Sequence, residues 1–136
     1  MKRLTVPARS DQLDNVLAFI TLELEAHGCP PKACLKLAVV AEEIFVNIAH
    51  YAYAPDEGDA TIEIAVTGDP PIAVLNFVDS GVPYNPLEKP DPNVSLSAEE
   101  REIGGLGIYM VKEIVDSIHY EYAKNRNVLT LTKALV

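Results

Sequence analysis

The spacing of hydrophobic residues predicts two amphipathic helices in the first half of the chain. The first covers residues 11–27, with Ser10 as its candidate N-cap and Gly28 at its end. The second covers residues 30–53 and opens on a proline pair, which the first turn of a helix tolerates. Each helix carries one apolar stripe, made by Leu13, Val16, Leu17, Ile20 and Leu24 in the first and by Leu37, Ala41, Ile44 and Ile48 in the second.

Five other segments alternate hydrophobic and polar residues as β-strands do, and a further helix lies among them. Because hairpin turns join four of these strands in pairs, we expect an α+β sandwich with a largely antiparallel or mixed sheet and helices on one face. A doubly wound sheet would need regular strand–helix alternation, which the chain lacks. The expected strands cover residues 2–8, 61–66, 72–78, 118–123 and 128–135, and the helix covers residues 108–117.

Residues 79–102 form a long segment without periodicity, rich in proline, serine and charge. A loop of this length inside a compact domain is either a functional lid or a sign of a wrongly assigned element. We interpret it as a lid over about residues 84–103, within a single domain that spans residues 1–136.

Composition narrows the classes of function. The 136 residues are 49% hydrophobic and 23% charged, which is typical of a globular domain. The net charge of −9 disfavours nucleic acid and anionic membranes as partners and suits a basic protein. We recognise neither a membrane-spanning stretch nor a signal peptide, and we interpret Cys29 and Cys34 as reduced structural thiols. A cytoplasmic location is therefore expected.

Three short motifs carry candidate chemistry, and the first lies on the second helix. Glu43, Asn47 and His50 fall on one helical face among apolar neighbours. A carboxylate and a carboxamide on one face can hold a divalent cation and orient a hydroxyl or a water. The alternative is a solvated polar stripe.

The second motif, DSG, follows the strand that ends near Val78. Asp79 can accept a hydrogen bond from an exocyclic amine, and Gly81 permits a close backbone approach or a positive φ. The alternative is an ordinary turn, because Asp, Ser and Gly are common turn residues.

The third motif is GGLG, residues 104–107, immediately before a helix. Glycines at a helix start leave N–H donors free, and the helix dipole favours an anion there. The motif is neither a P-loop nor a dinucleotide fingerprint, because it lacks the P-loop lysine and a surrounding βαβ unit. The alternative is a hinge at the end of the lid.

Taken in order, these motifs make the chain resemble the GHKL ATPases and, among them, the bacterial anti-sigma factor serine/threonine kinases. The resemblance covers about residues 35–135 and rests on the stretches EEIFVNIAHYAY, DSGVPYNPLEKPDP, EEREIGGLGIYMVKEIVD and NVLTLTKAL. It implies the Bergerat α/β sandwich, ATP as substrate and Mg²⁺ as cofactor. Pro83 departs from the wider pattern, which has a second glycine there, and we interpret it as a marker of this branch.

The resemblance also implies roles for individual residues. Glu43 would be the general base, Asn47 the Mg²⁺ ligand, and Asp79 the acceptor for the adenine amine, with Gly81 packed near the base. Arg101 would reach the γ-phosphate or be an exposed lid charge, and His50 would neighbour Glu43 or pack as a helix residue. The remaining ATP contacts would come from Gly104, Gly105, Leu106, Gly107 and Thr130.

The function implied is an ATP-dependent protein serine/threonine kinase that acts as an anti-sigma regulatory factor. It would phosphorylate an anti-anti-sigma partner, sequester a sigma factor and form a homodimer. The alternative is a nucleotide-gated binding module without significant kinase activity. A third hypothesis is a stand-alone ATPase or phosphotransfer domain. Glu43 favours catalysis, because a binding module needs no base beside the metal site.

Overall fold

The computed structural model describes residues 1–88 and 105–136. Within them, no helix is long and apolar enough to cross a membrane. Most of the expected lid lies outside the described residues. In chain order the elements are β1 (Lys2–Pro7), the 3₁₀ helix η1 (Ser10–Gln12), α1 (Leu13–Ala26), α2 (Pro31–Tyr51), β2 (Asp59–Thr67), β3 (Ile72–Asp79), the 3₁₀ helix η2 (Pro86–Glu88), α3 (Gly105–Ile114), β4 (Ser117–Ala123) and β5 (Arg126–Ala134).

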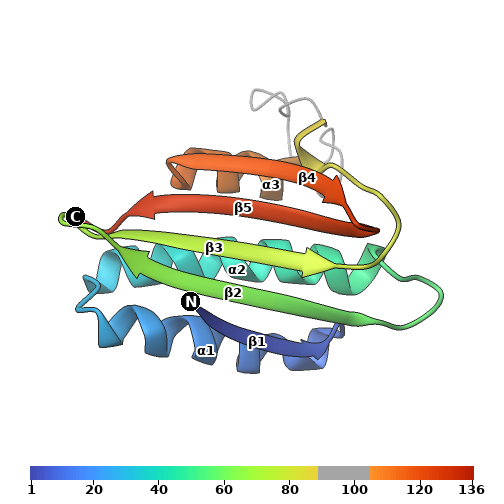
Figure 1. Ribbon diagram of the computed structural model, residues 1–136, viewed down its shortest axis with the longest axis horizontal. Helices are drawn as coiled ribbons and strands as arrows, with labels where there is room; N and C mark the ends of the chain where they lie inside the picture. The colour runs from blue at the N-terminus through green and yellow to red at the C-terminus, as the bar shows by residue number, and fades with distance from the viewer. Residues whose placement is uncertain (89–104) are drawn as a thin grey trace.

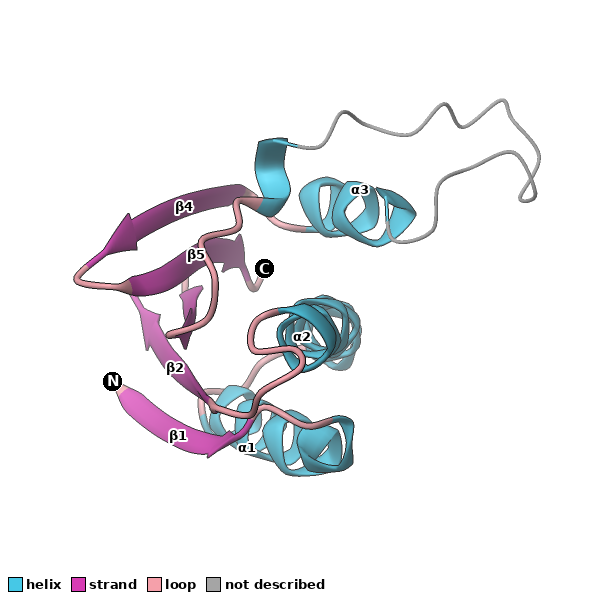
Figure 2. Ribbon diagram, turned by 90° about the vertical axis from the view of Figure 1, so that its right-hand side faces the viewer, coloured by secondary structure: helices cyan, strands magenta, loops and turns pink. Residues whose placement is uncertain are grey.

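The five strands form one sheet in the order β1-β2-β3-β5-β4, and each neighbouring pair is antiparallel (Figure 1). The helices α1, α2 and α3 all lie on the same side of this sheet (Figure 2). The predicted α+β sandwich is therefore confirmed, with the antiparallel rather than the mixed form of the sheet.

The hydrophobic core lies between the sheet and the helices. The apolar stripes of α1 and α2 supply one side of it, and alternate residues of β2, β3 and β5 supply the other. Phe45 and Phe77 are almost completely buried, and each side chain of this size contributes about 1.5–3 kcal/mol on burial. Ile48, expected in the core stripe, packs against this core but is only partly buried, and it also lines a cavity.

The ends of all three helices differ from the prediction, and α3 covers Gly105–Ile114 rather than residues 108–117. The Ser10 hydroxyl does not cap α1; it lies 3.3 Å from His50 Nε2, and α1 begins three residues later at Leu13. The second helix ends at Tyr51 rather than at residue 53. Gly28 ends α1 as predicted: its φ is +71°, and Gly28 N–H and Cys29 N–H donate to the carbonyls of Glu25 and Leu24, the pattern of a Schellman motif.

Cys29 and Cys34 are free thiols at the junction of α1 and α2. Burial, with a hydrogen bond to Cys34, raises the pKa of Cys29 to about 12. A thiol with so high a pKa stays protonated and unreactive at neutral pH, which fits the structural role that we expected.

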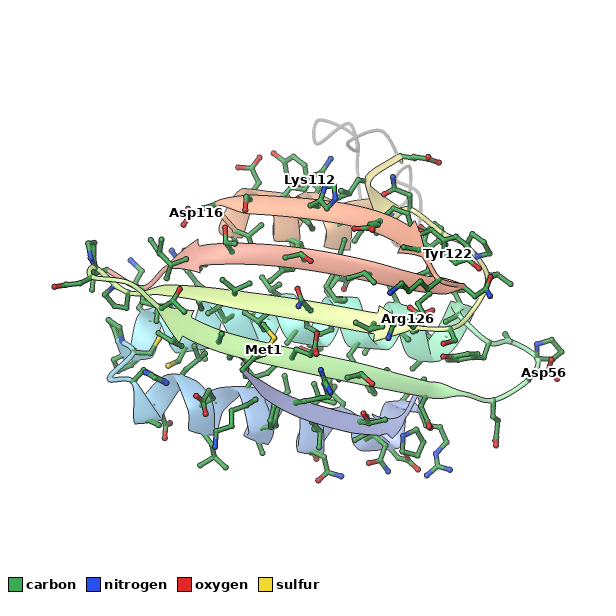
Figure 3. The ribbon with its side chains drawn as sticks, in the orientation of Figure 1. Met1, Asp56, Lys112, Asp116, Tyr122 and Arg126 are labelled. Carbon is green, nitrogen blue, oxygen red and sulfur yellow. The ribbon has the colours of Figure 1, made fainter. Side chains whose placement is uncertain are left out.

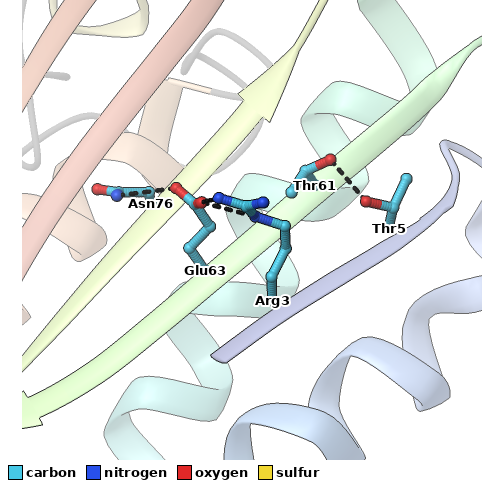
Figure 4. Close-up of polar contacts among 5 residues, drawn as sticks. All are labelled: Arg3, Thr5, Thr61, Glu63 and Asn76. Carbon is cyan, nitrogen blue, oxygen red and sulfur yellow. Dashed lines mark hydrogen bonds and ion pairs between the residues drawn. The ribbon is translucent and has the colours of Figure 1, made fainter. Parts of the chain in front are cut away.

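The sheet face opposite the helices carries a row of polar contacts (Figure 4). Arg3 binds Glu63 at 2.6 Å, and Asn76 Nδ2 donates to the other Glu63 oxygen at 3.1 Å. The hydrogen bond from Arg3 is the main cause of the lowered pKa of Glu63. Thr5 and Thr61 form a second pair, with their hydroxyl oxygens 2.9 Å apart.

One end of the sheet gathers the loops that build the site. Tyr122 and Arg126 mark the β4–β5 hairpin, which lies at the same end of the molecule as the loop containing Asp56 (Figure 3). The hairpin turns through Lys124 and Asn125, both with positive φ, as a tight two-residue turn requires. The strand β3 ends at this same end, at Asp79 (Figure 1).

Candidate functional site

A cavity of about 460 Å³ opens between α2 and the ends of β3, β4 and β5. Most of its wall is apolar, formed by side chains such as Ile48, Phe77 and Leu129. Two residues of the sequence motifs, Asn47 and Asp79, line it together. An apolar cavity with a few convergent polar groups is the usual form of a small-molecule site.

Asp79 is the buried polar group of this cavity, with 7% of its surface exposed. Gly81 N–H and Asn127 Nδ2 both donate to its Oδ1 at 2.9 Å. Among the described residues both hydrogen bonds reach the same oxygen, which leaves Oδ2 available as an acceptor. Desolvation raises the pKa of Asp79, although the two hydrogen bonds oppose that shift.

The loop after Asp79 is held against the end of α2 by its backbone. Val82 N–H donates to the Ala52 carbonyl at 2.9 Å, and a Cβ on Gly81 would overlap that carbonyl. The Tyr53 hydroxyl accepts from Ser80 N–H at 2.7 Å and donates to Asp59 O at 2.6 Å. Gly81 therefore serves close backbone approach; a positive φ, the other possibility, is not observed.

Asn127 is a site residue that the sequence analysis missed. It is 93% buried at the start of β5, and its amide nitrogen donates to Asp79 Oδ1 and to Val82 O, each at 2.9 Å. Its amide oxygen accepts from Tyr84 N–H at 3.1 Å and from the Tyr120 hydroxyl. One side chain thus joins the carboxylate, the loop and β4. The sequence offered two signals, its position beside a hairpin turn and its place at the start of the stretch NVLTLTKAL, and neither identifies a partner.

Thr130 does not lie where the prediction placed it. It alternates with the buried Leu129 and Leu131 and pairs with Asn76 and His119 in the sheet register. It therefore faces the side of the sheet opposite the cavity, on the same side as the Glu63–Asn76 contact. The expectation that Thr130 holds adenine is corrected: β5 meets the cavity through Asn127 and Leu129.

Asn47 connects the cavity to Glu43. The Asn47 amide donates to Glu43 Oε1 at 3.3 Å, one turn back along α2. Among the described contacts, its carbonyl oxygen therefore remains available to accept a hydrogen bond or to bind a cation. The Glu43 carboxylate also meets α3, because a Cβ on Gly107 would overlap it. The first and third motifs are therefore in contact.

The remaining predicted site residues are Arg101, the residues of the third motif and His50, and the structure describes only some of them. Gly105 is the first residue of α3, which Leu106 and Gly107 continue, and nothing further is described for Gly105 or Leu106. Arg101 and Gly104 lie outside the described residues. His50 is exposed and contacts Ser10 and Tyr51, so among the described contacts it joins the N-terminal 3₁₀ helix rather than Glu43.

Fold and cavity together define a class of protein: an α+β sandwich domain with a small-molecule cavity between one long helix and the sheet. Comparison with known proteins agrees. Residues 6–133 match the model of the histidine kinase-like ATPase domain family, and the chain belongs to that family. The predicted resemblance to this superfamily is thereby confirmed, and membership implies ATP binding.

Two individual proteins are also similar to this chain, one in sequence and one in structure. The serine/threonine-protein kinase BtrW of Bordetella bronchiseptica is 26% identical over 96 residues, which cover 71% of this chain and 67% of that protein. The crystal structure of the RsbU and RsbW domains of Rv1364c from Mycobacterium tuberculosis superposes with a TM-score of 0.68 at 17% identity, over 99% of this chain. This chain spans 33% of that solved chain, and the likeness concerns the fold.

Proposed function

We propose that this chain is an ATP-dependent protein serine/threonine kinase that acts as an anti-sigma regulatory factor and phosphorylates an anti-anti-sigma partner. The observation that carries the proposal is the contact between Glu43 and Asn47. It links a carboxylate, able to act as a base, to an amide that lines the nucleotide cavity. Family membership and the relative named as a kinase support the same reading.

The cavity fits the adenine base of ATP. Its apolar walls, including Ile48, Phe77 and Leu129, can bury the two faces of a planar aromatic ring. Asp79 Oδ2 accepts from the exocyclic amine, while Gly81 and Asn127 fix the other oxygen. A buried carboxylate discriminates strongly between nucleobases. A base without the exocyclic amine would leave Asp79 Oδ2 buried without a hydrogen-bond donor.

The donor set on α2 fits a hard cation. Asn47 would hold Mg²⁺ through its carbonyl oxygen, since its nitrogen is occupied by Glu43. The bound ion would supply charge neutralisation on the phosphate oxygens. Two roles then fall to the protein: Asn47 orients the phosphates, and Glu43 takes the proton of the acceptor hydroxyl. The serine oxygen bonds to the γ-phosphorus as the bond to the β–γ bridging oxygen breaks, giving phosphoserine and ADP.

The experiment measures γ-phosphate transfer from Mg-ATP to a purified anti-anti-sigma domain by wild type and Glu43→Gln. We expect Glu43→Gln to bind ATP as wild type does, since its amide oxygen can still accept from Asn47. Transfer should fall by about 10²–10⁴-fold, the usual worth of a general base. Glu25→Gln, an exposed change on α1, is the control.

Two outcomes would contradict the kinase proposal. A nucleotide-dependent complex without transfer would indicate a binding module. Metal-dependent ATP hydrolysis without transfer to any protein would indicate a stand-alone ATPase.

A further inference from the structure

A second cavity, of about 260 Å³, lies between α2 and α3, which are neighbours in Figure 2. The walls are apolar side chains of both helices, and two carboxylates reach it from α2. We call it the α2–α3 groove, and its main residues are Val39, Glu42, Glu43, Val46, Gly107 and Met110.

An exposed apolar stripe leads into this groove. Leu35 is 70% exposed and Val39 39%, and together with Val46 they fall on one face of α2. Across the groove, Met110 of α3 is 41% exposed. Apolar side chains that gather at a groove and stay exposed are typical of protein interaction sites, and methionine suits irregular partners.

The order of residues along α2 relates the groove to the nucleotide cavity. Tyr51 and Asn47 line the nucleotide cavity, whereas Glu43 lines the groove. Glu43 lies about 12 Å from Tyr51 along the axis, at the helical rise of roughly 1.5 Å per residue. The carboxylate therefore lies at the boundary, bonded to Asn47 on one side and open to the groove on the other.

We propose that the α2–α3 groove docks the serine- or threonine-bearing segment of the protein phosphoacceptor. A hydroxyl presented in this groove reaches Glu43 from the side opposite the adenine end. An apolar residue of the segment packs between Val39 and Met110. A lysine or arginine of the segment pairs with Glu42, which agrees with a chain of net charge −9.

This inference rests on the proposed kinase function, so its test separates binding from transfer. The probe is a short synthetic peptide with a central serine between leucine and lysine, and a matched peptide has glutamate in place of both flanking residues. Amide NMR shifts of wild type, saturated with a non-hydrolysable Mg-ATP analogue, report where each peptide binds. We expect shifts at Val39, Val46 and Met110, with binding at least about tenfold weaker for the acidic peptide.

Two variants test the groove directly. Val39→Glu and Met110→Glu place a charge on the apolar walls at positions exposed enough to keep the fold. Each should weaken peptide binding about tenfold or more and leave Mg-ATP affinity at the wild-type value, because neither residue lines the nucleotide cavity. Leu22→Glu is the matched control, since Leu22 is 68% exposed on α1 outside the groove.

The outcomes are distinct. Shifts confined to other surfaces, or peptide affinity unchanged in both groove variants, would overturn the docking proposal whatever the kinase assay gives. Peptide bound in the groove without phosphate transfer from Mg-ATP would support the groove and count against the kinase function.

Discussion

At the scale of single residues, burial of the Asp79 carboxylate costs folding free energy and at the same time suits it to bind a ligand. It lies in an apolar cavity, and burial makes its ionised form unfavourable, as the raised pKa shows. The same burial strengthens its interaction with any ligand donor. Asp79 and Asn47 were predictable from their motifs. Asn127 was not, and Thr130 was misplaced, because period-2 alternation fixes which face a residue occupies only once the register is known.

Asn127 is expected to position Asp79, and Thr130 is not. Asn127→Ala removes four hydrogen bonds and leaves buried groups unpaired, so we expect unfolding free energy to fall by about 1–3 kcal/mol and ATP affinity to fall with it. Thr130→Ala, three residues away on the other face, should keep wild-type ATP affinity. Calorimetric titration of both variants checks this, and equal losses would contradict the assignment.

The raised pKa of Asp79 also predicts how stability depends on pH. A group whose folded-state pKa lies above its unfolded value contributes stability that is full below that unfolded value and is lost as pH rises through the folded-state pKa. Asp79→Asn retains the oxygen that accepts from Gly81 and Asn127 but cannot ionise. The unfolding free energy of this variant minus that of wild type should therefore be larger at neutral pH than near pH 4. Urea unfolding of both proteins at both pH values measures this difference in unfolding free energy. A difference that does not change with pH would contradict the raised pKa of Asp79.

At the scale of elements, α2 organises the site. Its C-terminal end holds the loop after β3, its middle carries Asn47, and Glu43 meets α3 one turn further back. Helical periodicity predicts that Glu43 and Asn47 share a face, and the structure confirms it. No pattern in one helix, however, shows which other helix it packs against. The contact with Gly107 is therefore a tertiary feature that the sequence left open.

Gly107 and Glu43 should behave as a coupled pair. A Cβ at Gly107 overlaps the Glu43 carboxylate, the far end of a flexible side chain, so Gly107→Ala should displace that carboxylate and break its hydrogen bond from Asn47. We expect a net destabilisation of about 0.5–1.5 kcal/mol, the usual worth of one hydrogen bond. In a Glu43→Ala background the space is free, and the same change should be neutral or stabilising by up to about 1 kcal/mol, because alanine favours helix over glycine. A double-mutant cycle by urea unfolding measures the coupling, and additive effects would contradict the described contact.

At the scale of the whole molecule, the layers were predictable and the arrangement within them was not. Two amphipathic helices with paired alternating strands admit few architectures, and the α+β sandwich is one of them. The strand order β1-β2-β3-β5-β4 needs long-range pairing, such as β3 with β5, that local pattern does not encode. That pairing brings Asp79 opposite Asn127 and so builds the cavity wall.

The central claim is that this chain binds Mg-ATP with Asp79 as the adenine acceptor. Calorimetric titration of Mg-ATP and Mg-ADP into wild type, Asp79→Asn and the exposed control Asp11→Asn tests it most directly. We predict binding by wild type and the control, and a loss of about 10–100-fold in Asp79→Asn, the worth of one hydrogen bond to a charged group. Folded wild type that binds neither nucleotide, or an Asp79→Asn variant that binds as tightly as wild type, would contradict the account.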